Sequence, residues 1–170
     1  HALLGIVPGT FEELLWNGEK TEDPFSLFQL PNAAVCLQNS HLLNATIREN
    51  LTLGRDFSDE SCLEALNDCC IAEEVMHMPD GLGTLAGENG IMLSGGQKQR
   101  ILLARMLLTH PRLYLLDDAT SALDGKTERK ILETLRERIR RDNGAAVIVS
   151  DSDNVKAMAD RILSIGGNAS

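Results

Sequence analysis

The sequence predicts an α/β fold with a mostly parallel sheet and a block of helices inserted into it. Three short, uniform apolar runs, at residues 33–37, 113–116 and 145–149, are typical of buried strands. Between the first two runs the pattern is helical from about residue 42 to residue 109. After residue 113 strands and helices alternate, which indicates β-α-β units with parallel strands. The length of 170 residues is that of one domain, or of one domain with a small appendage.

The first 40 residues contain a turn and a strand. Residues 1–9 have the pattern of the end of a helix, which leads us to expect that an N-terminal part of the domain is missing before residue 1. Asn17-Gly18 follows an apolar triplet and predicts a hairpin-type turn. The strand at 33–37 ends at Gln38.

The helical block contains two clear helices. Ser58 begins an amphipathic helix that reaches about residue 70, and a glycine-rich connection follows from Pro79 to Gly90. The second helix runs from about Gly96 to Thr109, where a proline closes it.

The strand at 113–116 is followed by Asp117 and Asp118. Their carboxylates therefore emerge at the carboxyl end of the strand, which is the edge where open α/β sheets bind ligands. The alternation is completed by a helix at 127–141, the strand at 145–149, a short helix at 155–159 and a strand at 162–165.

Composition and charge exclude several classes of protein. The chain is 43% hydrophobic and contains no apolar run near the ~20 residues of a membrane span. Its four cysteines form no CxxC pair, so we expect reduced thiols rather than a disulfide framework or a zinc site. The net charge is −9, although residues 98–141 are basic. We expect a solvated helix face and no nucleic-acid partner, because acidic residues interleave with basic ones at helical spacing. That face would comprise Glu128, Arg129, Lys130, Glu133, Arg136, Glu137 and Arg140.

A candidate anion site lies at the start of the second helix. Ser94, Gly95 and Gly96 place free backbone N–H groups and a hydroxyl at the positive end of the helix, where phosphate binds well. The alternative is that Ser94 only caps its helix.

The string from Leu93 to Asp124 resembles the signature-to-D-loop block of ATP-binding cassette (ABC) ATPases. Gln38 resembles the Q-loop glutamine, residues 42–51 resemble the stretch that follows it in exporter-type cassettes, and residues 84–90 resemble the exporter X-loop. The resemblance implies a P-loop NTPase-like (RecA-like) fold. It would have a partial core at 1–40 and 111–170 and an inserted helical subdomain at 41–110, which carries the X-loop and the signature.

The resemblance also implies roles for residues at the chain's own ATP site. Asp117 and Gln38 would hold Mg²⁺, and Gln38 is also a catalytic candidate. Asp118 stands where the family has a catalytic glutamate, and it is one methylene shorter. Asp151 stands where the family has the switch histidine, and its charge would repel a phosphate. Both departures predict a catalytically weak site.

Other residues would act on the ATP of a partner cassette. The signature residues in this role are Ser94, Gly95, Gly96 and Gln97, and the D-loop residues are Ser121 and Asp124. For Asp124 the alternative is that it caps the next helix.

The sequence contains no P-loop of the form GxxxxGK(S/T). Gly125-Lys126-Thr127 is a chance match to its last three positions, because residue 120 is threonine where a glycine is required. Without the backbone cradle and the lysine of that loop, we expect the chain not to bind ATP tightly.

Two functions are compatible with these residues. The first is a partial cassette of an exporter-type ABC transporter that completes a composite ATP site with a second cassette, preferably in a heterodimer, and powers transport by a transmembrane domain. It would lie at the cytoplasmic side of the membrane, with its coupling surface near residues 38–50 and Glu88. The second is a P-loop-less binding or regulatory module without ATPase activity.

Overall fold

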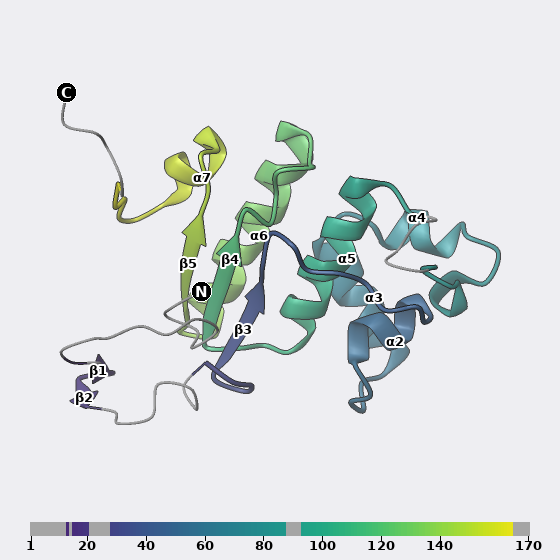
Figure 1. Cartoon of the computed structure of the whole chain (residues 1–170), viewed down its shortest axis with the longest axis horizontal. Coiled ribbons are helices and arrows are strands. Elements are labelled where there is room, and N and C mark those ends of the chain that lie inside the picture. Colours follow the sequence, from purple (N-terminus) through teal and green to yellow (C-terminus); the bar gives the residue numbers. More distant parts are fainter. Residues whose placement is uncertain (1–12, 14, 21–27, 88–92, 165–170) are drawn as a thin grey trace.

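The computed structural model describes residues 13, 15–20, 28–87 and 93–164. A parallel sheet is formed by β3 (Ala33–Cys36), β4 (Leu113–Asp117) and β5 (Ala145–Val149), with β4 in the middle (Figure 1). Ala33 pairs with Leu113, and Leu113 pairs with Ala145, so the three strands end at the same edge. The predicted α/β fold with a parallel sheet is confirmed.

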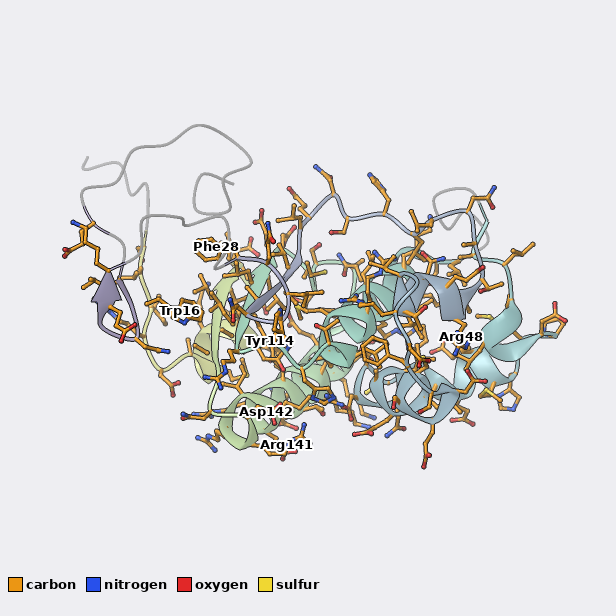
Figure 2. All side chains as sticks on the ribbon, turned by 90° about the horizontal axis from the view of Figure 1, so that it is seen from below. Trp16, Phe28, Arg48, Tyr114, Arg141 and Asp142 are labelled. Carbon is orange, nitrogen blue, oxygen red and sulfur yellow. The ribbon has the colours of Figure 1, made fainter. Side chains whose placement is uncertain are left out.

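Side chains of β4 alternate between the two faces of the sheet, as the pleat requires. Tyr114 and Leu116 belong to the main hydrophobic core, which also includes the buried residues of the helices. Leu113 and Leu115 lie on the other face, in a smaller cluster that Trp16 packs against (Figure 2). The sheet is therefore covered on both sides along this strand.

Trp16 comes from a short antiparallel hairpin of β1 (Leu15–Trp16) and β2 (Glu19–Lys20). Its two turn residues, Asn17 and Gly18, have φ values of 52° and 85°. Asparagine and glycine tolerate this left-handed conformation best, which is why the predicted turn forms at this dipeptide.

The helices α2 (Ile47–Thr52), α3 (Asp59–Asp68), α4 (Ala72–Met76) and α5 (Gly95–Leu108) gather beyond β3, with a 3₁₀ turn, η1, at Gly81–Gly83 (Figure 1). α5 contacts β3 as well as α2 and α3, and residues 101–104 and 106–108 are buried. Ser58 caps α3 as predicted, and the predicted start of α5 is correct to within one residue. α2 and α4 were not individually predicted.

Two more helices complete the fold. α6 (Gly125–Arg141) connects β4 to β5, and α7 (Asp153–Met158) follows β5. The prediction that Glu128 lies on a solvated face of α6 is wrong, because this residue is only 6% exposed. Glu128 lies three and seven residues before the buried Ile131 and Leu135, so helical geometry places it on the same inward face.

The predicted last strand is wrong for its described residues. Residues 162–164 form no strand, and Ile162 and Leu163 are 58% and 72% exposed. A short apolar run becomes a strand only when a neighbouring sheet edge accepts its backbone groups. Ile165, the predicted helix end at residues 1–9 and residues 88–90 lie outside the described residues. Within the part that is described, no helix has the length and hydropathy needed to cross a membrane.

Candidate functional site

Two predicted site residues meet at the carboxyl edge of the sheet. The amide Nε2 of Gln38, two residues beyond β3, donates to Oδ2 of Asp118 at 3.3 Å. Asp117 is the last residue of β4 and pairs with Val149. Asp118 follows with φ at 51°, and its backbone N–H donates to the carbonyl of Val149 at 2.9 Å. Parallel register thus brings together a glutamine and a carboxylate that are 80 residues apart.

Asp151 lies at the same edge, two residues beyond β5, and it is exposed. It sits in a small turn in which the N–H of Ser152 donates to Oγ of Ser150 at 3.1 Å. No hydrogen bond or ion pair joins the Asp151 carboxylate to any other described residue. Its side chain is therefore exposed to solvent.

The start of α5 is organised by a reciprocal capping box. The N–H of Gln97 donates to Oγ of Ser94 at 3.2 Å, and Oε1 of Gln97 accepts from the N–H of Ser94 at 2.9 Å. Nε2 of Gln97 donates to Glu74 of α4 at 3.0 Å. Arg100 donates two hydrogen bonds to the same carboxylate, at 2.6 and 3.1 Å, and these bonds lower the pKa of Glu74. Both polar ends of the Gln97 side chain are thus used within the chain, whereas Ser94 and Gly95 are exposed.

The D-loop segment, Ser121–Asp124, lies against this helix start. A methyl group added to Gly96 would approach the carbonyl oxygen of Ala122 to 3.2 Å, which is tighter than ordinary contact. The side-chain amide of Gln99 accepts from the N–H of Ala122 at 2.8 Å and donates to Oγ of Ser121 at 3.1 Å. Gln99 was not predicted as a site residue, and no sequence pattern pointed to this contact.

Asp124 caps α6. Its Oδ1 accepts from the N–H groups of Lys126 and Thr127 at 3.1 and 3.0 Å. Hydrogen bonds from Thr127, first from its side chain and then from its backbone, lower the pKa of Asp124. Gly125-Lys126-Thr127 accordingly forms the first turn of α6. The capping role of Asp124 is confirmed, and a role toward a partner subunit stays a prediction.

Glu128 is a buried connecting residue near this edge of the sheet that was not predicted from the sequence. Its carboxylate accepts three hydrogen bonds, from Thr120 at 2.7 Å, Ser152 at 2.8 Å and Asn154 at 2.7 Å. Burial raises the pKa of Glu128, whereas the hydrogen bonds from Asn154, Thr120 and Ser152 lower it. The hydrogen bonds together outweigh burial, so the pKa lies below its ordinary value. One buried carboxylate thus ties the loop after β4 to the loop after β5. The signal was its spacing from Ile131 and Leu135 in the apolar stripe of α6.

The chemistry of the sheet edge fits a magnesium–nucleotide ligand. Mg²⁺ usually keeps several waters and is held by one or two carboxylates together with substrate phosphates. Asp117 and Gln38 offer oxygen donors of this kind at adjoining strand ends. Among the residues that the structure describes, no three His, Cys, Asp or Glu side chains cluster as a metal site.

A family model described as "ABC transporter" matches residues 1–121 of this chain. The chain belongs to the ABC transporter family. It is 42% identical over 135 residues to the uncharacterized ABC transporter ATP-binding protein YwjA of Bacillus subtilis, covering 79% of this chain and 23% of that protein. It is 38% identical over 127 residues to the mitochondrial iron-sulfur clusters transporter ATM1 of Saccharomyces cerevisiae, covering 74% of this chain and 18% of ATM1.

Among solved structures, the ABC cassette is similar to a bacterial Atm1-family ABC exporter with ATP bound. The TM-score is 0.78 at 33% identity, over 91% of this chain and 27% of the exporter chain. The predicted resemblance to an exporter-type ABC cassette is confirmed. This chain spans less than a quarter of the length of the curated relatives named above.

Proposed function

We propose that this ABC cassette completes a composite ATP site with a partner cassette, by contributing its signature segment, Leu93–Gln97, to a nucleotide held by the partner. The observation that carries the proposal is the start of α5. Oγ of Ser94 accepts the N–H of Gln97, which leaves its own hydroxyl hydrogen free to donate. The N–H groups of Gly95 and Gly96 have no acceptor within the helix. Three donors at a positive helix end suit the γ-phosphate.

The chain's own ATP site is slow or inert in this proposal. The Asp118 carboxylate is one methylene shorter than the glutamate of the family pattern, and misplacing a catalytic base by about 1 Å costs on the order of 10²-fold in rate. Asp151 adds negative charge to the same sheet edge, which raises the cost of bringing a phosphate there. Asp117 and Gln38 would hold the Mg²⁺ of a bound Mg-ATP at this edge.

The partners follow from the exporter family. We assign residues 41–110 as the helical subdomain and residues 1–40 with 111–170 as the core. A transmembrane domain would dock near residues 38–50 and Glu88, which places the cassette at the cytoplasmic side of the membrane. A second cassette would face the signature. A heterodimer is favoured, because a partner with a complete catalytic site would supply what Asp118 and Asp151 lack.

The test compares two signature variants with a cap variant in the full transporter. Gly95→Asp and Ser94→Arg should abolish ATP hydrolysis by the complex, because each places a side chain where the phosphate must approach the backbone. Ser58→Arg is the matched control. Ser58 caps α3 through the N–H of Ser61 at 3.1 Å, far along the chain from the signature. Losing either serine cap should cost about 1 kcal/mol of stability.

ATPase turnover and thermal melting of all three variants decide the outcome. The proposal requires Ser94→Arg and Ser58→Arg to melt alike while only Ser94→Arg loses turnover. An active complex that carries Gly95→Asp would refute the trans role of the signature. It would favour the other candidate, a binding or regulatory module, because the chain contains no GxxxxGK(S/T) motif.

A further inference from the structure

The side chain of Gln99 bridges α5 and the D-loop segment with both of its polar atoms. Oε1 accepts from the backbone N–H of Ala122 at 2.8 Å, and Nε2 donates to the hydroxyl of Ser121 at 3.1 Å. An amide that is held at both ends keeps one rotamer and fixes its partners in distance and in orientation. The D-loop segment is therefore attached to the signature helix by a side chain, and not only by the chain that connects them.

Further hydrogen bonds connect Ser121 to Asp118 and Gln38, the candidate residues of the chain's own ATP site. Having accepted from Gln99, the hydroxyl of Ser121 donates to the backbone carbonyl of Asp118 at 3.0 Å. The side chain of Asp118 in turn accepts from Gln38 at 3.3 Å. Ser121 accepts from Gln99 and donates to Asp118, and Asp118 accepts twice, through its backbone carbonyl and through its carboxylate, so the bonds are mutually compatible. These bonds, joined through the covalent frame of Asp118, connect the signature helix to the carboxyl edge of the sheet.

Backbone packing supports the same junction. The carbonyl oxygen of Ala122 lies 3.2 Å from the place that a Cβ on Gly96 would occupy, and Leu123 lies 3.8 Å from it. The Ala122 methyl is 3.6 Å from the corresponding position on Gly95. Gly96 therefore has a second use besides access for phosphate, because it lets the D-loop segment lie directly on the first turn of α5, whereas a methyl group on Gly95 would make only an ordinary contact.

We propose that Gln99 is a positioning residue that holds the D-loop segment on the signature helix, so that the two segments move as one body. This inference rests on the proposed trans role of the signature. Both segments would then reach the partner's nucleotide in a fixed relation. A change at Gln38 and Asp118 would also be transmitted to the signature helix through Ser121.

The first arm of the test measures amide hydrogen exchange in the full chain. Gln99→Met keeps the size of the side chain and removes both polar atoms, so exchange at the Ala122 amide should rise at least about tenfold. Gln99→Glu keeps an acceptor for that N–H and should retain most of its protection. Lys98→Met is the matched control, since Lys98 is a half-buried neighbour whose side chain makes no hydrogen bond with the described residues. It should leave exchange at Ala122 unchanged.

The second arm measures steady-state ATPase of the transporter assembled with its partner cassette. Gln99→Met should lower kcat for Mg-ATP about tenfold with KM within about twofold, because it misplaces groups that act on the transition state. Gln99→Glu should restore part of kcat, which a purely structural role does not predict. Lys98→Met should match the wild type.

The two arms separate the possible failures. Unchanged exchange at Ala122 in Gln99→Met would refute the bridge itself, whatever the turnover. Faster exchange with unchanged kcat would refute the positioning role, provided that Gly95→Asp abolishes turnover in the same assay. If Gly95→Asp is active, the proposed trans role fails instead, and the exchange arm alone still tests whether Gln99 joins the two segments.

Discussion

Two features of Asp118 determine where its carboxylate lies. Its φ of 51° lies in the left-handed region, where aspartate is more easily accommodated than most residues. Its short side chain already reaches Gln38. The backbone conformation and the length of the side chain therefore both act on the position of this carboxylate.

We predict that restoring the family residues at this edge acts cooperatively. In a full transporter whose cassette also carries a P-loop, Asp118→Glu alone should recover little hydrolysis at this cassette's own site, because Asp151 would still face the phosphate. Asp118→Glu with Asp151→His should recover more than the sum of the single changes, since both residues act on one transition state. Single-turnover hydrolysis measures this. Additive recovery would mean that another feature silences the site.

Glu128 gives a prediction on pH. Its pKa is lowered in the folded chain, so the stability that it contributes is present above the ordinary value of 4.5 and is lost as pH falls through the lower folded value. Glu128→Gln should be less stable than the wild type near neutral pH, and the difference should shrink as the pH falls below 4.5. Urea unfolding at several pH values measures it. Glu133→Gln, an exposed change on the same helix, should show no such trend.

At the scale of elements, a buried arginine joins three helices. Arg138 of α6 is only 4% exposed. Its Nε donates to Asp68 of α3 at 2.6 Å, and its Nη1 donates to the carbonyl of Leu107 of α5 at 3.3 Å. The guanidinium thus links the helix between β4 and β5 to the group of helices beyond β3.

We predict that Arg138→Met lowers the free energy of unfolding by about 3 kcal/mol, because it leaves Asp68 without its buried partner. Adding Asp68→Leu should recover most of the loss, since the unpaired charge is then removed as well. The exposed Arg140→Met should change stability by no more than about 0.5 kcal/mol. Equilibrium urea denaturation tests all three. A double variant as unstable as Arg138→Met would show that packing, not charge, is lost.

The elements that could be predicted from sequence are those with strong local signals. Residues 113–116 of β4 are apolar, and Ser58 and Ser94 cap their helices, so the starts of these three elements were correct to within one residue. The predicted strand at 162–165 is wrong for its described residues, because apolar character does not indicate whether a neighbouring strand has a free edge to pair with. Glu128 was predicted on the solvated face because it is charged, although its spacing from Ile131 and Leu135 indicates the buried face.

The site was predictable only in part, for a similar reason. Gln38 and Asp118 end neighbouring parallel strands, and the order of the strands brings them together. The bridge from Gln99 to Ser121 and Ala122 depends on how α5 lies across the loop after β4. No periodicity or motif spacing encodes that contact, so only the structure reveals it.

At the scale of the whole molecule, the missing P-loop motif determines how tightly we expect the chain to bind ATP. The 170 residues include no GxxxxGK(S/T) loop, so the backbone cradle and the lysine that hold the β- and γ-phosphates are lacking. We predict that this chain alone binds Mg-ATP with a Kd no tighter than about 1 mM and shows negligible ATPase activity. Calorimetric titration measures the affinity, and micromolar binding would contradict the prediction.

The capping box of α5 has a consequence for nucleotide selectivity. The amide oxygen of Gln97 accepts from Ser94 and its amide nitrogen donates to Glu74, so both polar atoms of this side chain are already engaged within the chain. What this face presents is a serine hydroxyl and peptide N–H groups, which respond to the charge and shape of a phosphate. If this surface contacts the nucleotide of a partner cassette as proposed, we predict that it accepts adenosine, guanosine and cytidine triphosphates alike, and that any preference for one nucleobase arises in the cassette that holds the base.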